Sequence, residues 1–233
     1  LASYSTPKIA TIHGKRLLFS LTRQGLVAMN PKDGSVKFSR WFRSRVNESV
    51  NAANPVVSGS QVFCSSSYYG AGSFLLDVGI DCESFNEVWS TYERRKRDRK
   101  LKPVLEIHWT TPILHDGHLY AFTGRNEPDA KFRCVELKTG KIKWNREESW
   151  RAYSTKQPKV YGRGSALMAD GKLFVLGEGG LLGLFEVTPD KPVELARYQV
   201  PEFHYPCWAA PILSDKRLYI RSESYLICFN VSK

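Results

Sequence analysis

Apolar and polar positions alternate along the chain in a pattern that recurs. Residues 110–122 read TTPILHDGHLYAF, which is an apolar pair, a short polar turn containing Gly, and an apolar–aromatic run. Two apolar runs joined by such a turn predict a β-hairpin. Four further stretches have the same form: 6–19, 54–63, 165–174 and 210–219.

The spacing of these hairpins indicates an internal repeat. The equivalent positions lie 48, 57, 54 and 45 residues apart, at Pro7, Pro55, Pro112, Ala166 and Pro211. This alignment places His115 and His118 at hairpin-turn positions, where Asp and Gly are explained by turn chemistry. We therefore predict that these two histidines lie at the surface rather than in a metal or catalytic site.

A second hairpin follows the first in each repeat. Residues 132–144 read FRCVELKTGKIKW, and 25–37, 182–196 and the more divergent 74–89 follow the same plan. Each has an apolar strand, a polar turn, and an outgoing strand that commonly ends in Trp or another aromatic residue. Two hairpins make a four-stranded antiparallel sheet, and such sheets repeating every ~40–50 residues are typical of propeller blades.

The predicted fold class is therefore all-β, a β-propeller of four blades and a partial fifth. The whole chain, 1–233, is expected to be a single propeller domain or part-propeller. The C-terminal part of a larger propeller is favoured, because the chain opens at a first-strand motif; alternatively, residues 1–5 supply the missing strand. The approximate blade ranges are 6–50, 51–92, 108–150, 161–202 and 208–233.

Composition adds little to the class of protein. Of 233 residues, 34 are Lys or Arg and 23 are Asp or Glu, which gives a net charge of +11. No apolar run approaches the ~18 residues of a membrane-spanning helix. The chain begins with Leu1 rather than Met, so we expect a processed protein or a fragment.

The cysteines favour packing over chemistry. There are five, at widely spaced positions, with no CxxC pair and no two adjacent. Neither a zinc site nor a dense disulfide framework is indicated, and we predict that most are free, buried thiols. They are Cys64, Cys82, Cys134, Cys207 and Cys228.

The repeat resembles a known family. The endings LKTGKIKW at 137–144 and NPKDGSVKF at 30–38 are similar to the pyrroloquinoline-quinone-type propeller repeat, and Ala28, Cys134 and Cys228 match its small-residue position. Runs along the whole chain, such as VNAANPVV and LEIHWTTPILHDG, resemble envelope-associated quinone-type propeller proteins of planctomycete and verrucomicrobial bacteria. A more distant resemblance is to the propeller lipoprotein of outer-membrane protein assembly.

The resemblance implies two functional classes. One comprises quinone-dependent alcohol and sugar dehydrogenases, which hold the quinone between a Trp and a ring formed by adjacent cysteines and bind Ca²⁺. The other is a non-enzymatic scaffold. Since this chain has no adjacent cysteine pair, we predict no cofactor, with pyrroloquinoline quinone as the less favoured alternative. No GxSxG, HExxH or P-loop motif is present, and Gly177–Gly180 is interpreted as a Gly-rich turn.

Candidate binding residues lie in the loops that lead into each innermost strand, because function in such folds concentrates on loops. These loops combine aromatic, histidine, carboxylate and guanidinium groups, which suits a sugar or a peptide; alternatively, they serve packing alone. Arg125 lies in a further loop, which should join the second and third strands of the third blade on the same face, and Tyr68 and Tyr69 lie in the matching loop of the second blade. The candidates are Asn51, Asn54, Glu106, His108, Trp109, Arg125, Tyr161, Arg163, His204 and Trp208.

The segment 92–102, YERRKRDRKLK, carries much of the positive charge. It is either a solvated insertion or a patch for an anionic partner. Aromatic residues do not alternate with its charges, so nucleic-acid binding is not indicated. The patch residues are Arg94, Arg95, Lys96, Arg97, Arg99 and Lys100.

Three hypotheses remain. The favoured one is a non-catalytic module that binds a protein, a glycan or another small polar ligand, with a periplasmic or cell-envelope location implied by the resemblance. The second is part of a quinone- or metal-dependent oxidoreductase. The third is polyanion binding through the basic insertion. No catalytic residue and no metal ligand is predicted.

Overall fold

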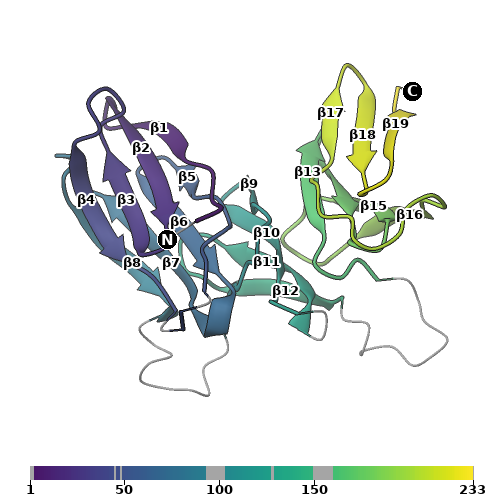
Figure 1. The fold of residues 1–233 in the computed structure, drawn as a ribbon, viewed down its shortest axis with the longest axis horizontal. Coiled ribbons are helices and arrows are strands. Elements are labelled where there is room, and N and C mark those ends of the chain that lie inside the picture. Colours follow the sequence, from purple (N-terminus) through teal and green to yellow (C-terminus); the bar gives the residue numbers. More distant parts are fainter. Residues whose placement is uncertain are drawn as a thin grey trace. The chain divides into compact units, whose positions relative to one another are not determined.

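The computed structural model consists of five antiparallel β-sheets that follow one another along the chain (Figure 1). It describes residues 3–44, 46–47, 49–92, 103–126, 129–148 and 160–232. The first four sheets have four strands each and the fifth has three. We call these sheets blades one to five. The all-β prediction and the order of four blades and a partial fifth are confirmed.

The chain divides into two compact units. Unit 1 comprises Leu1–Thr111 and Glu136–Lys141, and unit 2 comprises Pro112–Val135 and Ile142–Lys233. Whether the whole chain forms one propeller domain stays a prediction. Among the described residues, no helix is long and apolar enough to cross a membrane.

Unit 1 contains blades one and two, whose apolar faces pack together. Their shared core includes Phe19, Phe42, Phe74 and Leu76, all with no exposed surface. A one-turn 3₁₀ helix, Tyr68–Gly70, joins two strands of blade two. The strands are β1 (Lys8–Ile12), β2 (Lys15–Thr22), β3 (Gly25–Met29), β4 (Val36–Trp41), β5 (Val56–Ser58), β6 (Gln61–Ser66), β7 (Gly72–Val78) and β8 (Phe85–Ser90).

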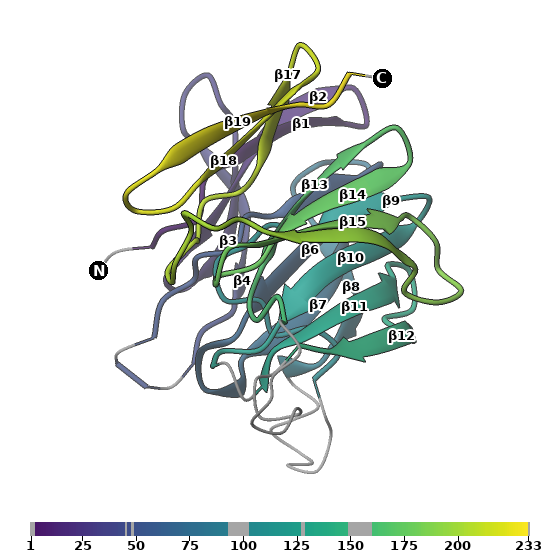
Figure 2. The ribbon, with the colours of Figure 1, turned by 90° about the vertical axis from the view of Figure 1, so that its right-hand side faces the viewer.

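Unit 2 contains blades three to five (Figure 2). One buried cluster, with Phe132 and Phe185, joins blades three and four. Another, with Phe203 and Leu218, joins blades four and five. The strands are β9 (Ile113–His115), β10 (His118–Thr123), β11 (Lys131–Glu136), β12 (Ile142–Glu147), β13 (Ser165–Ala169), β14 (Lys172–Leu176), β15 (Leu181–Glu186), β16 (Glu194–Gln199), β17 (Ile212–Ser214), β18 (Arg217–Arg221) and β19 (Leu226–Asn230).

The turn at His115–His118 is a tight hairpin turn, as predicted. β9 ends at His115 and β10 begins at His118, and the two residues pair across the strands. The residues between them, Asp116 and Gly117, have φ angles of 43° and 71°. Positive φ at both central positions characterises the type I′ turn, which matches the twist of the flanking strands. Asp170–Gly171 repeats this geometry, with φ of 48° and 67°.

The aromatic residue that ends each of the first three repeats is a core residue. Phe38, Trp89 and Trp144 are 7–8% exposed. The indole Nε1 of Trp89 donates a hydrogen bond of 2.9 Å to Leu137 O within unit 1. That of Trp144 donates one of 3.0 Å to Thr188 O within unit 2. Each indole therefore buries a large apolar ring while its polar atom is satisfied, as a buried Trp requires.

The cysteines are all free, and four of the five are buried. Ala28 and Cys134 pair across the strands with Phe38 and Trp144, as expected of the small-residue position. Cys228 is exposed, so its expected packing role is not seen; no described strand lies beyond β19 to cover it. Burial raises the pKa of both Cys134 and Cys207 to about 11, which keeps these thiols protonated and unreactive near neutral pH.

Candidate functional site

The two candidate asparagines of unit 1 hold backbone segments together. The Asn51 side chain is buried, and its Nδ2 donates hydrogen bonds to Thr22 O (2.8 Å) and Phe42 O (3.0 Å). Asn54 Oδ1 accepts a hydrogen bond of 2.7 Å from Thr6 N. Both side chains thus tie the connection after blade one to β2 and to the segments next to β1 and β4. Binding of a ligand by either of them stays a prediction.

The histidine and tryptophan candidates of unit 1 form an aromatic cluster. The ring of His108 lies 5.1 Å from that of Tyr68 and 4.9 Å from that of Trp109, measured between centroids. Ile107 N donates to the buried Ser65 Oγ at 3.0 Å, which holds this segment against β6. Glu106 lies in the same segment and is half-buried. The structure therefore brings together three rings from two loops that the sequence indicated separately.

In unit 2, a buried carboxylate organises three of the candidates, Arg125, Arg163 and Trp208. Glu178 has no exposed surface. Its Oε1 accepts hydrogen bonds from Arg163 N (3.0 Å) and Arg163 Nε (3.1 Å), and its Oε2 accepts one from Arg163 Nη2 (2.9 Å). The remaining amino group of Arg163, Nη1, donates to Arg125 O at 2.7 Å. This forked ion pair compensates the cost of burying both charges.

Glycine is required where the chain passes around this carboxylate. A Cβ on Gly162 would lie 2.6 Å from Glu178 Oε1, and one on Gly177 would lie 2.7 Å from Tyr161 Cα. Real Cβ atoms do not approach other atoms so closely. The Gly-rich turn at 177–180 is therefore confirmed as a turn, and its glycines let backbone and carboxylate meet.

The loop 203–208 places the side chain of Trp208 beside Glu178 and that of Tyr205 beside Trp208. Trp208 Nε1 lies 3.4 Å from Glu178 Oε2 as a long hydrogen bond, and Cys207 N donates to Glu178 O at 2.9 Å. Tyr205 and Trp208 are 49% and 47% exposed. Their rings meet edge to face, with centroids 5.9 Å apart. We call these two exposed rings the Tyr205–Trp208 patch; His204 is exposed next to it.

Tyr161 lies in the interior instead of at the surface. Its hydroxyl donates a hydrogen bond of 2.7 Å to Glu194 Oε1, and its backbone N donates one of 2.9 Å to Glu148 Oε2. Its ring packs edge to face on Phe185. The side chain is therefore placed to hold blades three and four together. A role in contacting a ligand stays a prediction.

Around Tyr161, two carboxylates share two guanidinium groups. Arg146 Nε lies 2.9 Å from Glu148 Oε1 as an ion pair without hydrogen-bond alignment, and Arg146 Nη2 lies 2.7 Å from Glu194 Oε2. Arg197 Nη2 lies 2.6 Å from the same Glu194 oxygen. We call these four charged residues the Arg146 network.

The two carboxylates of the network differ in acidity. Burial raises the pKa of Glu148 to about 7, and the charge of Arg146 offsets only part of that effect. Burial also acts on Glu194, but hydrogen bonds from Arg197 and Tyr161 and the charge of Arg146 leave its pKa below the ordinary value. Glu148 therefore titrates near neutral pH while Glu194 stays ionised.

Sequence reasoning missed the three carboxylates that organise unit 2. A charged residue inside a Gly-rich turn between apolar strands, as at Glu178, signals a buried ion pair. Glu148 and Glu194 carried no comparable signal, because their partners come from other strands. Among the described residues, no group of three or more His, Cys, Asp or Glu is arranged to hold a metal ion.

Most of the basic insertion cannot be compared with the prediction. Residues 93–102, including Arg94, Arg95, Lys96, Arg97, Arg99 and Lys100, lie outside the described residues. Polyanion binding through this segment stays a prediction.

Comparison with protein families gives one match. The family model described as outer membrane protein assembly factor BamB matches residues 1–146, which is more than half of the chain. None of the curated proteins compared with the chain matches it.

Solved structures share the fold at low sequence identity. BamB from Moraxella catarrhalis is 14% identical, with a TM-score of 0.58 over 93% of this chain and 54% of its own. A quinohemoprotein alcohol dehydrogenase, ADHIIG from Pseudomonas putida HK5, is 12% identical, with a TM-score of 0.65 over 98% of this chain and 40% of its own. The computationally designed protein Ika8 is 9% identical, with a TM-score of 0.55, and the match covers 92% of this chain and 55% of that one. The chain thus spans about half the length of these structures, and the blades are those of a pyrroloquinoline-quinone-type β-propeller.

Proposed function

Because the chain belongs to the family of the outer membrane protein assembly factor BamB, we propose that it is a non-catalytic β-propeller module that binds a protein partner in the bacterial cell envelope. The envelope location and the protein partner both derive from the family. The described residues add a candidate contact surface, the Tyr205–Trp208 patch.

The observation that carries the proposal is the exposure of two aromatic rings on a rigid base. Tyr205 and Trp208 are each about half exposed, although apolar packing would favour burying them. Trp208 is anchored through its Nε1 to Glu178, which Arg163 holds in turn. Large aromatic side chains that are already ordered before binding are typical of the energetic centre of a protein interface.

The charges of unit 2 do not suit the quinone and calcium chemistry of the dehydrogenases. A Ca²⁺ site needs several oxygen ligands that are not already neutralised. The buried carboxylates of Glu178 and Glu148 are each paired with a guanidinium group, of Arg163 and Arg146 respectively. The chain also has no adjacent cysteines to form the ring that covers the quinone. These pairings and the lack of adjacent cysteines support the non-catalytic proposal, and we derive no redox step from these residues.

Site-specific crosslinking tests the proposal. A photoreactive benzoylphenylalanine replaces Tyr205 in the full protein in its native host, and irradiation is followed by mass spectrometry. The matched control carries the same group at Leu195, an exposed apolar position on β16 of the same unit. We expect one protein to be crosslinked from position 205 and not from position 195.

The affinity of the purified pair then measures the contribution of the patch. Trp208→Ala should weaken binding by at least about tenfold, as for a central aromatic contact, whereas Leu195→Ala should change it less than about twofold. Equal crosslinking from both positions would contradict the proposal. Capture of a glycan instead of a protein would also contradict it, as would oxidation of alcohols or sugars by the protein supplied with pyrroloquinoline quinone and Ca²⁺.

A further inference from the structure

A groove in unit 1 is lined by three neighbouring turns. Its volume is about 610 Å³, within the range of sites that hold a small molecule or a few peptide residues. It lies where the turns β1–β2, β3–β4 and β7–β8 meet. We call it the turn groove; its lining is Ile9, Gly14, Lys15, Arg16, Leu17, Asn30, Pro31, Lys32, Lys37, Asp81, Cys82 and Glu83.

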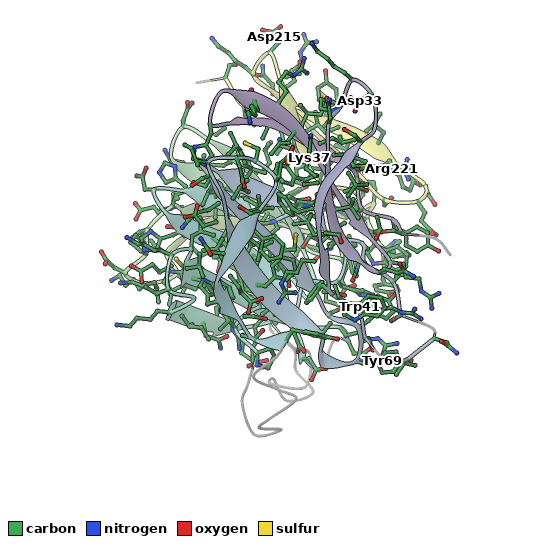
Figure 3. The ribbon with its side chains drawn as sticks, turned by 90° about the vertical axis from the view of Figure 1, so that its left-hand side faces the viewer. Asp33, Lys37, Trp41, Tyr69, Asp215 and Arg221 are labelled. Carbon is green, nitrogen blue, oxygen red and sulfur yellow. The ribbon has the colours of Figure 1, made fainter. Side chains whose placement is uncertain are left out.

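The turn groove lies at the opposite end of the strands from the candidate residues of unit 1. In an antiparallel sheet, the turns β1–β2 and β3–β4 share one end, and the turn β2–β3 lies at the other. Figure 3 shows Asp33 and Lys37 at one end of these strands, and Trp41 and Tyr69 at the other. The groove is therefore separate from Asn51, His108 and their neighbours.

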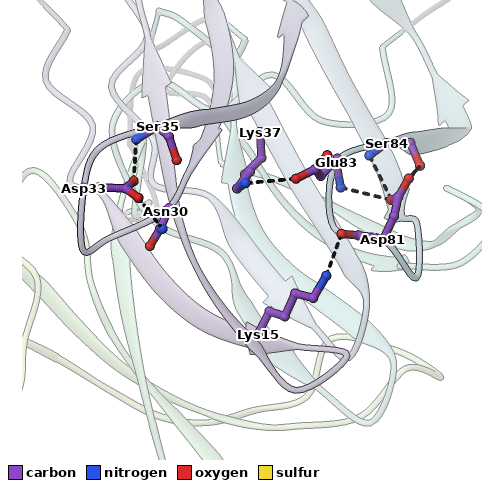
Figure 4. Close-up of polar contacts among 8 residues, drawn as sticks. All are labelled: Lys15, Asn30, Asp33, Ser35, Lys37, Asp81, Glu83 and Ser84. Carbon is purple, nitrogen blue, oxygen red and sulfur yellow. Dashed lines mark hydrogen bonds and ion pairs between the residues drawn. The ribbon is translucent and has the colours of Figure 1, made fainter.

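Two lysines bridge blade one to the β7–β8 turn of blade two (Figure 4). Lys37 Nζ pairs with Glu83 Oε1 at 2.9 Å, and Lys15 Nζ donates to Asp81 O at 3.0 Å. The neighbouring His13 Nε2 lies 3.1 Å from Val78 O, which adds a third bridge. The walls of the groove thus come from two blades that are tied together within one unit.

The nearby aspartates are occupied by their own turns. Asp81 Oδ1 accepts hydrogen bonds from Glu83 N (3.0 Å) and Ser84 N (3.1 Å). Asp33 Oδ1 accepts one from Ser35 N (2.8 Å), and its Oδ2 accepts one from Asn30 Nδ2 (2.9 Å). Hydrogen bonds from Ser35 lower the pKa of Asp33, and those from Glu83 and Ser84 lower the pKa of Asp81. Both aspartates therefore serve to fix their turns, and Glu83 is the lining carboxylate engaged by a lysine side chain.

The remaining lining is positively charged with an apolar strip. Four cations (Lys15, Arg16, Lys32 and Lys37) face two carboxylates (Asp81 and Glu83), which gives the lining a net charge of +2. Arg16 and Lys32 are both exposed. Ile9, which is 46% exposed, and Pro31 contribute apolar surface beside them.

We propose that the turn groove binds an acidic segment of a partner protein. The cations come from three different strands and turns and do not converge on a point, so they match several carboxylates along a peptide better than one phosphate. Carboxylates of the segment would pair with Arg16 and Lys32. Another would take the place of Glu83 on Lys37, while an apolar side chain of the segment covers Ile9 and Pro31.

A labelled peptide tests the proposal on the purified full chain. The probe is a fluorescein-labelled hexapeptide that alternates glutamate and leucine, measured by fluorescence anisotropy against its glutamine–leucine counterpart. We expect the acidic peptide to bind at least about tenfold more tightly than the neutral one. Its affinity should also fall as salt concentration rises, because the contacts are exposed ion pairs.

Charge reversal locates the site. The double variant Arg16→Glu and Lys32→Glu should weaken binding at least about tenfold. The matched control, Lys8→Glu and Lys138→Glu, makes the same change in net charge at exposed positions of unit 1 outside the groove. It should weaken binding less than about twofold. An equal loss in both variants would overturn the proposal, because binding would then follow net charge alone.

Glu83→Gln should change the affinity for the acidic peptide in the opposite direction. Removing the internal carboxylate releases Lys37, so the acidic peptide should bind about threefold to tenfold more tightly. A variant that merely disturbed the fold would not improve binding. Unchanged or weaker binding by Glu83→Gln would contradict the proposed displacement.

Two further arms distinguish the turn groove from a small-anion site and from the Tyr205–Trp208 patch. Inorganic phosphate and unlabelled glutamate–leucine peptide are each used to displace the labelled peptide. Displacement by phosphate at a lower concentration than the unlabelled peptide requires would overturn the proposal in favour of a small-anion site. Trp208→Ala should leave peptide binding unchanged. Failure at the turn groove would thus be distinct from failure of the Tyr205–Trp208 patch.

Discussion

Two contacts between blades can be compared, that of blades one and two in unit 1 and that of blades three and four in unit 2. Each combines an arginine beside an aromatic ring with an ion pair, but the carboxylates are more deeply buried in unit 2. In unit 1, the Arg40 guanidinium lies 3.9 Å from the ring centroid of Phe74 and pairs with Glu87, which is 36% exposed. In unit 2, the Arg146 guanidinium lies 5.1 Å from the ring centroid of Phe185 and pairs with Glu148 and Glu194, which are 1% and 17% exposed.

The difference lies in how easily water can replace a lost partner. Glu87 can be hydrated if Arg40 is removed, whereas Glu148 is enclosed by protein. A buried ion pair adds little net stability when intact, but it is costly to break, because one charge is left without compensation. We therefore expect unit 2 to depend on its buried charges more strongly than unit 1.

Replacing the arginines gives the largest expected effect. At about pH 8.5, where Glu148 is ionised, Arg146→Met should lower the free energy of unfolding by about 3–5 kcal/mol, because Glu148 and Glu194 would both lose this counter-ion. Arg40→Met should cost about 1–2 kcal/mol, mainly from the lost contact with Phe74 and from the loss of an ion pair whose carboxylate water can reach. Urea unfolding of both variants measures the comparison, and equal losses would contradict it.

The pH dependence of stability should have opposite signs in the two units. Burial raises the pKa of Glu148 to about 7 from an ordinary value of 4.5, so its contribution is fully present below 4.5 and is lost as the pH rises through 7. In unit 1, hydrogen bonds lower the pKa of Asp33 and Asp81 below 3.8. Their contribution is present above 3.8 and is lost in acid. Unit 2 should therefore lose up to about 3 kcal/mol between pH 4.5 and 7.

Hydrogen exchange resolved by peptide measures this contrast, after correction for the intrinsic pH dependence of exchange. Protection of blade three should fall between pH 5 and 7.5, whereas that of blade one should not. Glu148→Gln should remove the slope, since glutamine does not titrate. A slope that survives this substitution would assign the titration to another group.

Trp89 in unit 1 and Trp144 in unit 2 should contribute similar amounts to the free energy of unfolding. Trp89→Phe and Trp144→Phe each remove one indole donor and leave a carbonyl, of Leu137 or Thr188, without that hydrogen bond. Each variant should lose about 1–2 kcal/mol of unfolding free energy. Thermal unfolding monitored by circular dichroism compares the two losses. A difference of more than about twofold would show that the repeat position is not equivalent in the two units.

The smallest effects are expected from the outer ion pairs. Lys37→Gln in unit 1 and Arg197→Gln in unit 2 each remove a partly exposed cation from a carboxylate. Both should change the free energy of unfolding by less than about 1 kcal/mol, because water and salt screen such pairs. A large loss of unfolding free energy for Arg197→Gln in urea unfolding would show that Arg146 alone does not neutralise Glu148 and Glu194.

The repeat made the fold predictable. The hairpin at 110–122 and its four relatives carry local turn signals, and such turns form from a few adjacent residues irrespective of distant contacts. His115 and His118 were placed correctly as turn residues by this reasoning. The candidate site was harder to predict from the sequence, because Asn51 and Tyr161 are engaged in hydrogen bonds with segments far away in the sequence.

By itself, the sequence determined the all-β class, the order of the blades, their hairpin turns and the aromatic residue that ends each of the first three repeats, because each of these depends on local periodicity and turn chemistry. Only the tertiary structure decided which charged groups meet. The enclosure of Glu178 by Arg163 and Trp208, the Arg146 network and the turn groove each join residues from separate strands. Their energies depend on burial and on distance between side chains, which no local pattern encodes.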